Sequence, residues 1–297
     1  MRAKTSRTRE LLKPDRIDNP SVLALARTLA EGSYERVLLC EGDSWFDIYT
    51  PAPLPEPNLL DALRTPRRAL LVDISHIGDT AKQMATDPEA ANTLALLNEF
   101  KFDALLLSAG GNDLKNAFKE AFMRALVHAR AKTVMPKEIE VMTATPSKAD
   151  ALFEEIVGYI VQWIGLRQKS MLNKTTPVVL HGYDYLQPRP APARATVNGL
   201  PVSGPWLYPI LHEAGKSDEE MRAIAKDVID TLNNWLVKLV KPLPGVHVLD
   251  TRNTLTLAEP GTKKASNDWM DEIHALPEGW AKLAAKAWNP KLATLLA

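Results

Sequence analysis

The chain has 297 residues, and its 45% hydrophobic and 24% charged content is typical of globular proteins. Its 36 Lys and Arg residues balance 36 Asp and Glu residues, so the formal net charge is zero. This balance argues against a broad nucleic-acid interface, because such an interface needs a basic face. Cys40 is the single cysteine, so no intrachain disulfide can form, and we expect Cys40 to be a small buried residue.

Residues 1–18 carry six Lys and Arg side chains and are expected to form a basic, flexible tail. The apolar stretch after this tail is short and contains Arg27, which is atypical of a signal peptide. The sequence has no run of about 18 apolar residues, so no transmembrane helix is expected. Cytoplasmic residence is the default prediction, and export by a route without a cleaved signal stays open.

Short apolar runs alternate along the chain with segments of helical periodicity. The runs predict five strands, at residues 37–40, 68–73, 102–108, 177–182 and 246–250. Helices are expected at residues 21–29, 58–64, 89–100, 114–132, 147–174, 217–240 and 277–288. Strands that alternate with helices in this way predict a parallel sheet with helices on both faces. We therefore expect one three-layer α/β/α domain over residues 19–297, with a helical insertion at 113–175 and a Pro-rich loop at 183–216.

Three of the predicted strands are followed by turns with chemically useful groups. Ser44 follows the first strand, Gly78 follows the second and Asn112 follows the third. In an open parallel sheet, ligands bind outside the carboxyl ends of the strands, so these three residues are expected at one edge. A Gly-Asp-Ser turn is by itself common loop chemistry, and the role of Ser44 depends on what the rest of the chain supplies.

Asp271 and His274 lie three residues apart, just before the last predicted helix. A serine nucleophile needs a base that takes its proton, and the base needs a partner that orients it and stabilises its charge. His274 and Asp271 have these two chemistries. The backbone N–H groups of Ser44 and Gly78 and the side-chain amide of Asn112 are the candidate donors for a developing oxyanion. The alternatives are structural: turn residues at Ser44 and Gly78, a helix cap at Asn112 and a surface histidine at His274.

Four sequence blocks resemble the signatures of the SGNH (GDSL) hydrolases. In chain order they are Gly42-Asp43-Ser44-Trp45, Gly78 within Ile77-Gly78-Asp79-Thr80, Gly110-Gly111-Asn112-Asp113 and Asp271-Glu272-Ile273-His274. The resemblance spans residues 37–288 and implies a flavodoxin-like five-stranded parallel sheet with strand order 2-1-3-4-5. It also implies ester hydrolysis through a covalent acyl-enzyme, with no metal and no cofactor.

Two positions depart from the pattern of this family. Trp45 replaces the usual leucine, and Ala275 replaces the usual proline after the histidine. Neither change removes a catalytic group, so both bear on the substrate class more than on the mechanism. The candidate substrate-binding residues, each with structural packing as its alternative role, are Trp45, His76, His181, Tyr183 and Trp206.

The sequence therefore predicts a serine ester hydrolase that acts on a small-molecule carboxylic ester. Esters of short-chain acids, acetylated carbohydrates and lipids all stay open as substrates. The alternative is a catalytically inactive relative that binds a ligand or a partner in the same pocket. The oligomeric state is not indicated by the sequence.

Overall fold

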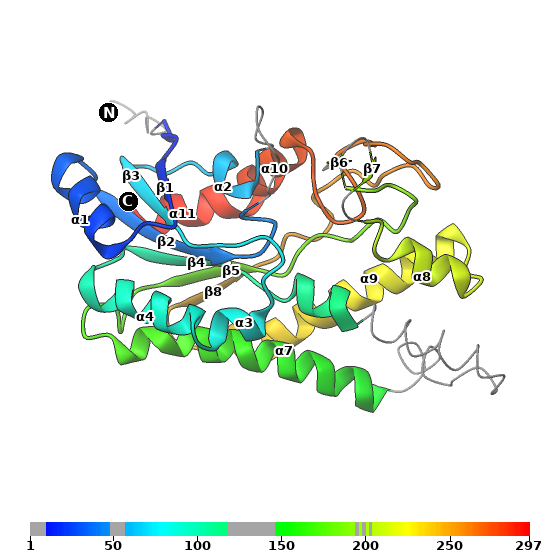
Figure 1. Cartoon of the computed structure of the whole chain (residues 1–297), viewed down its shortest axis with the longest axis horizontal. Helices are drawn as coiled ribbons and strands as arrows, with labels where there is room; N and C mark the ends of the chain where they lie inside the picture. The colour runs from blue at the N-terminus through cyan, green and yellow to red at the C-terminus, as the bar shows by residue number, and fades with distance from the viewer. Residues whose placement is uncertain (1–9, 48–56, 118–145, 194–195, 198–199, 202–203) are drawn as a thin grey trace, which may run out of the picture.

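The computed structural model describes residues 10–47, 57–117, 146–193, 196–197, 200–201 and 204–297. A six-stranded parallel sheet with the order β1-β3-β2-β4-β5-β8 forms the centre of the molecule (Figure 1). Its strands are β1 (Asp15–Asp18), β2 (Arg36–Gly42), β3 (Ala69–Asp73), β4 (Ala104–Ser108), β5 (Val178–His181) and β8 (Val246–Leu249). A separate antiparallel pair is formed by β6 (Thr196–Val197) and β7 (Leu200–Pro201).

Helices cover both faces of the sheet (Figure 1). On one side lie α2 (Leu59–Ala62), α10 (Pro277–Leu283), the π-helix η3 (Ala284–Trp288) and α11 (Asn289–Leu295). On the other side lie α3 (Ala81–Ala85), α4 (Glu89–Glu99), α7 (Pro146–Leu166) and α9 (Asp218–Trp235). The remaining helices are α1 (Val22–Glu31), which contacts α4, and α8 (Tyr208–Glu213), which contacts α9, together with η1 (Arg167–Lys169) and η2 (Leu236–Val240). The predicted three-layer α/β/α fold is confirmed.

The central strands form where the sequence has its continuous apolar runs. Leu38, Leu39 and Cys40 of β2 are fully buried, as are the leucines of β4, because helices shield both faces of the sheet. The order of the five predicted strands is the 2-1-3-4-5 order that the family resemblance implied. Since the strands are parallel, the segments that follow β2, β3, β4, β5 and β8 all leave the sheet at the same edge.

The sheet has one strand more than the sequence predicted. Residues 15–18, expected in the flexible tail, form β1, which pairs with β3 at the edge of the sheet. Arg16 of this strand places its guanidinium 2.5 Å from the carboxylate of the buried Asp73 in β3. The prediction failed because the strand Asp-Arg-Ile-Asp is short and polar, and because an ion pair holds it where the sequence shows no apolar alternation.

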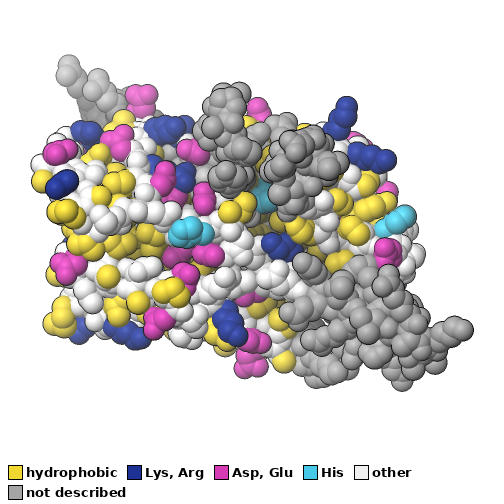
Figure 2. Space-filling model, in the orientation of Figure 1, with side chains coloured by type: hydrophobic (Ala, Val, Ile, Leu, Met, Phe, Trp, Pro, Cys, Tyr) yellow, Lys and Arg dark blue, Asp and Glu magenta, His cyan; other side chains and the backbone are white. Residues whose placement is uncertain are grey.

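Several predicted helix boundaries also differ. The helix predicted at 147–174 ends at Leu166, and the last predicted helix continues through η3 and α11 to Leu295. Residues 111–117 are helical, so the helix predicted from 114 begins earlier, whereas residues 118–145 of the expected insertion lie outside the described residues. Among the described helices, none is long and apolar enough to cross a membrane. On the face in Figure 2, basic and acidic side chains are interspersed over the described surface.

The ion pair between Arg16 and Asp73 gives a pH-dependent prediction. Burial raises the pKa of Asp73 to about 6, and the positive charge of Arg16 opposes this rise. The pKa of Asp73 is therefore higher in the folded protein than in the unfolded one. The protonated carboxyl favours the folded state at low pH, and this contribution to stability is lost as the pH rises through 6. Arg16→Met raises the folded pKa further, so we expect the free energy of unfolding to fall by about 3 kcal/mol at pH 8 and by clearly less at pH 5.

Urea unfolding at the two pH values measures this difference. Arg68→Met is the matched control, because Arg68 pairs with Asp15 at 3.3 Å while both side chains are about half exposed. Such a surface pair contributes at most about 1 kcal/mol, with little change between the two pH values. Equal losses for Arg16→Met at pH 5 and pH 8 would contradict the assignment of a buried, charge-dependent pair.

Candidate active site

Ser44 lies in a tight turn directly after β2. The N–H of Asp43 donates to the carbonyl of Ser108 (3.0 Å), which continues the β2–β4 ladder by one residue. The carbonyl of Asp43 then accepts the N–H groups of Phe46 (2.9 Å) and Asp47 (3.0 Å), so the chain turns through one helical turn. Ser44 is 6% exposed at the start of this turn. Its hydroxyl therefore stands at the carboxyl edge of the sheet, where the sequence predicted it.

The carboxylate of Asp43, beneath this turn, joins three segments of the site. One oxygen accepts the N–H of Trp45 (3.1 Å) and the hydroxyl of Ser108 (2.8 Å). The other accepts the Tyr183 hydroxyl, which in turn accepts the N–H of Gly111 (3.1 Å). A side chain at Gly111 would place its Cβ 3.0 Å from the Tyr183 ring, so it would require the ring to shift slightly. Asp43 thus fixes the ends of β2 and β4 and the segment after β5 relative to one another.

The charges in this network follow from its burial. Burial raises the pKa of Asp43, while the hydroxyl of Tyr183 and the other donors lower it. Burial and the neighbouring Asp43 raise the pKa of the Tyr183 phenol well above its ordinary value, so Tyr183 stays a neutral donor. Burial lowers the pKa of His181 to about 3, so this imidazole is uncharged near neutral pH.

Ser44, His274 and Asp271 are connected by two hydrogen bonds. The Nε2 atom of His274 lies 2.8 Å from the Oγ atom of Ser44, and its Nδ1 atom lies 2.8 Å from an oxygen of Asp271. The second oxygen of Asp271 accepts the backbone N–H groups of Ile273 and His274, each at 2.8 Å. The structure therefore brings together the three residues that the sequence singled out from blocks 230 residues apart.

The same contacts determine the charge of Asp271 and the tautomer of a neutral His274. Burial opposes ionisation of Asp271, but the His274 ring and the two backbone donors hold the pKa of this carboxyl below its ordinary value. An ionised carboxylate accepts a hydrogen bond, so the proton of a neutral His274 lies on Nδ1 and Nε2 is left to accept the Ser44 hydroxyl. This is the tautomer in which an imidazole acts as a general base toward serine.

Asn112 is located in the first turn of the helical segment 111–117, so it is not the residue that caps this helix. Its Nδ2 atom donates to the carbonyl of Asp79 (3.0 Å), and its Oδ1 atom accepts from the ammonium of Lys115 (2.5 Å). These two partners fix the orientation of the amide. Gly78 precedes Asp79 with a φ angle of +93° and is exposed. Its role as an oxyanion donor stays a prediction.

The five candidate substrate-binding residues occupy different places. Trp45 and Tyr183 line a pocket beside Ser44, and the ring of Trp206 lies 5.7 Å from the His274 ring. His76 is exposed, pairs with Asp79 at 3.7 Å and lines a separate hollow with Glu41 and Glu89.

The prediction for His181 as a pocket residue is wrong. Its side chain is fully buried beneath the site, with Nε2 3.1 Å from the hydroxyl of Ser108 and its ring against Trp45 and Trp288. His181 is the last residue of β5, and at this position the side chain still points into the core. It is therefore a packing residue.

The pocket beside Ser44 is largely apolar, and the sequence did not point to most of its walls. Besides Trp45 and Tyr183, its apolar side chains are Leu114, Leu186, Leu207, Ile229 and Ile273. Leu186 and Leu207 come from the irregular region where no periodicity marks an inward-facing residue. Lys115 and Asp43 are the two charged residues of its lining, and the Lys115 ammonium also lies 5.9 Å from the centre of the Trp206 ring.

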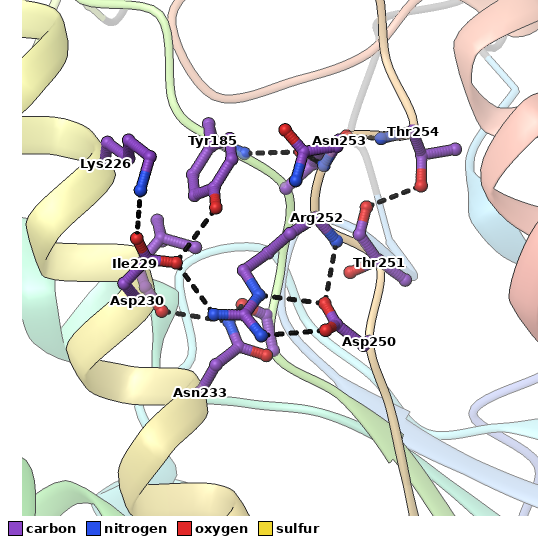
Figure 3. A network of polar contacts seen from close by, with 12 residues as sticks. Tyr185, Lys226, Ile229, Asp230, Asn233, Asp250, Thr251, Arg252, Asn253 and Thr254 are labelled. Carbon is purple, nitrogen blue, oxygen red and sulfur yellow. Dashed lines mark hydrogen bonds and ion pairs between the residues drawn. The ribbon is translucent and has the colours of Figure 1, made fainter.

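The segment that carries Tyr183 and Leu186 is held from outside by a polar network (Figure 3). Asp184 accepts four backbone N–H groups, from Tyr185, Asn253, Thr254 and Leu255, at 2.7 to 2.9 Å. Beside it, Arg252 bridges Asp230 of α9 and Asp250, and the Tyr185 hydroxyl donates to Asp230 at 2.9 Å (Figure 3). These contacts connect α9, the end of β8 and the segment after β5. In the part of the chain that is described, no group of three His, Cys, Asp or Glu side chains is arranged to hold a metal ion.

The chain was compared with known families and proteins. No family model matches the sequence. No curated protein matches it either. Among solved structures, it is similar to a phospholipase A1 from Streptomyces albidoflavus, with 13% identity, 88% of this chain and 98% of the other covered, and a TM-score of 0.39.

Two further structures are similar at the same level. One is an acetylxylan esterase from Geobacillus stearothermophilus, with 16% identity, 85% and 92% coverage and a TM-score of 0.36. The other is a protein described as a GDSL-like lipase from Parabacteroides merdae, with 13% identity, 88% and 97% coverage and a TM-score of 0.38.

The hydroxyl of Tyr183 gives a stability prediction. Tyr183→Phe removes a donor to the buried carboxylate of Asp43 and an acceptor for the N–H of Gly111. We expect the free energy of unfolding to fall by about 2 kcal/mol, because a hydrogen bond to a buried charge is lost. Urea denaturation measures the change. Tyr34→Phe is the control, because the Tyr34 hydroxyl makes no hydrogen bond to any described residue, and equal effects of the two substitutions would contradict the network.

Proposed function

We propose that this protein is a serine ester hydrolase of the SGNH type. The observation that carries the proposal is the pair of 2.8 Å hydrogen bonds from Ser44 to His274 and from His274 to Asp271. A serine hydroxyl that shares its proton with an imidazole, which a buried carboxylate orients in turn, is an activated nucleophile. A mainly apolar pocket of about 30 Å³ lies beside Ser44, next to the hydroxyl that would attack the ester.

In the proposed reaction, the Oγ atom of Ser44 attacks the carbonyl carbon of the ester. His274 takes the hydroxyl proton at Nε2, and Asp271 stabilises the imidazolium that results. The carbonyl oxygen becomes negative, and the N–H groups of Ser44 and Gly78 and the amide of Asn112 donate to it. His274 then gives its proton to the leaving alcohol, and an acyl-enzyme remains on Ser44. Water, deprotonated by His274, attacks the acyl-enzyme. The bond to the Oγ atom of Ser44 breaks, His274 returns its proton to this oxygen, and the carboxylic acid is released.

The proposed substrate is a carboxylic ester whose acyl group enters the pocket beside Ser44. Apolar walls favour a hydrocarbon acyl chain, and the alcohol part of the substrate would lie outside the pocket. A short-chain acyl ester and a lipid ester both fit this arrangement. An acetylated carbohydrate would place only its acetyl group in the pocket.

Ser44→Ala tests the nucleophile. We expect the variant to unfold at the same urea concentration as the wild type, because Ser44 supports little of the fold. We also expect it to lose hydrolysis of p-nitrophenyl esters over acyl lengths from acetyl to palmitoyl. A fluorophosphonate probe should label the wild type and leave Ser44→Ala unlabelled. Undiminished turnover in Ser44→Ala would refute the assignment, and a wild type with neither turnover nor labelling would favour a binding protein.

Asn112→Ala tests the oxyanion donor. Removing one such donor costs on the order of 100-fold in kcat, because the donor acts mainly on the charge of the transition state. KM for the preferred p-nitrophenyl ester should change much less. Steady-state kinetics separate the two constants. A loss of less than about tenfold in kcat would indicate that Asn112 only fixes the contact between its helix and Asp79.

A further inference from the structure

Glu272 is fully buried inside the loop that carries Asp271 and His274. Its carboxylate accepts backbone N–H groups from three consecutive residues, Trp206, Leu207 (2.9 Å) and Tyr208 (2.7 Å). A fourth N–H, from Arg189, lies 3.3 Å from the same carboxylate. One side chain therefore joins the loop of the candidate base to the segment at the start of α8.

This arrangement supplies hydrogen-bond acceptors to backbone N–H groups that would otherwise have none. The first N–H groups of a helix have no partner inside the helix, and buried N–H groups need one. Residues 206–208 precede or begin α8, and the acceptor that the structure gives to each of their N–H groups is the Glu272 carboxylate. A carboxylate has about four acceptor positions, which matches the four donors found here. Burial raises the pKa of Glu272 to about 7, and the backbone donors oppose this rise.

The segment that Glu272 holds forms part of the candidate site. Leu207 is a wall of the apolar pocket beside Ser44. The ring of Trp206 lies 5.7 Å from the His274 ring on one side and 5.9 Å from the Lys115 ammonium on the other. Trp206 therefore lies between the candidate base and the residue that contacts Asn112.

We propose that residues 206–207 form the specificity-determining wall of the site and that Glu272 is the positioning residue that holds this wall against the catalytic loop. This inference rests on the proposed ester hydrolase function. The fixed wall limits the length of the acyl chain that reaches Ser44. Glu272 acts through the backbone of 206–208 and touches neither the substrate nor the reacting atoms.

The test compares kcat/KM for p-nitrophenyl octanoate and butyrate at pH 8, with Leu207→Ala and Glu272→Gln. Leu207→Ala widens the pocket, and we expect the octanoate-to-butyrate ratio to rise about tenfold, the discrimination that one or two methylenes give in an apolar pocket. Glu272→Gln keeps the shape of the side chain but replaces one acceptor oxygen by a donor. It should raise the same ratio in the same direction. In the double variant the two effects should not add, because both act on one wall.

Asp268→Asn is the matched control. Asp268 is another buried carboxylate of the same loop, but it accepts from Thr256 (2.6 Å) and Lys282 (2.7 Å) and does not contact residues 206–208. Asp268→Asn should lower stability and leave the ratio within about twofold, as expected for a site without a shared wall.

The possible outcomes separate the two proposals. A wild type that neither hydrolyses esters nor reacts with fluorophosphonate overturns the proposed function and this inference with it. An active wild type whose ratio is unchanged in Leu207→Ala, or shifts equally in Asp268→Asn and Glu272→Gln, overturns this inference alone. If Glu272→Gln does not fold, Leu207→Ala and Trp206→Ala decide whether the wall sets the ratio.

Discussion

The geometry of the site depends on the buried carboxylate of Asp43. Through Trp45 and Ser108 it fixes the turn after β2 to the end of β4, and through Tyr183 it fixes the segment after β5. The same tyrosine accepts the N–H of Gly111, so the residue beside Asn112 belongs to the network as well. Burial of an anion is costly, and here hydroxyl and amide donors offset that cost. As a result, the spacing between Ser44 and Asn112 follows from the fold and needs no substrate to set it.

Other buried carboxylates hold the irregular segments around the site in the same way. Asp184 gathers four backbone N–H groups from two segments, Glu272 gathers four from two others, and Asp271 takes two from its own loop. Segments rich in proline lack regular hydrogen bonds, yet their buried N–H groups still need acceptors. One carboxylate can accept hydrogen bonds from several of these N–H groups. The loops of this site are therefore held by single carboxylates, some of them from distant parts of the chain, and not by continuous ladders of backbone hydrogen bonds.

The sequence predicts well those parts of the molecule that local patterns specify. The five central strands are continuous apolar runs, and Ser44, Asp271 and His274 lie in short turns next to predicted elements, while Asn112 lies at the start of a helix directly after β4. β1 was missed because Arg16 and Asp73, far apart in the sequence, hold it in place. His181 was misplaced because the residue at the end of a strand faces either the core or the pocket, and the register alone decides which. Leu207 and Glu272 were missed because their roles arise from a contact between two irregular segments, which periodicity does not reveal. The one signal of such a contact is the position of Glu272. This carboxyl side chain lies between Asp271 and Ile273, in a block whose other side chains are largely buried.

The polar groups of the site also separate the two charges that the proposed reaction creates. The positive charge develops on His274, whose Nδ1 atom already faces the ionised Asp271. The negative charge develops on the substrate oxygen near Asn112, whose amide oxygen accepts from the Lys115 ammonium. A cation on the oxygen of an amide polarises it and strengthens its N–H groups as donors. Both partners are in place before any substrate arrives, so little reorganisation is needed as the charges form. Trp206 lies between these two regions, with its ring 5.7 Å from the His274 ring and 5.9 Å from the Lys115 ammonium. The segment that shapes the pocket therefore also borders the groups that respond to the two charges of the proposed reaction.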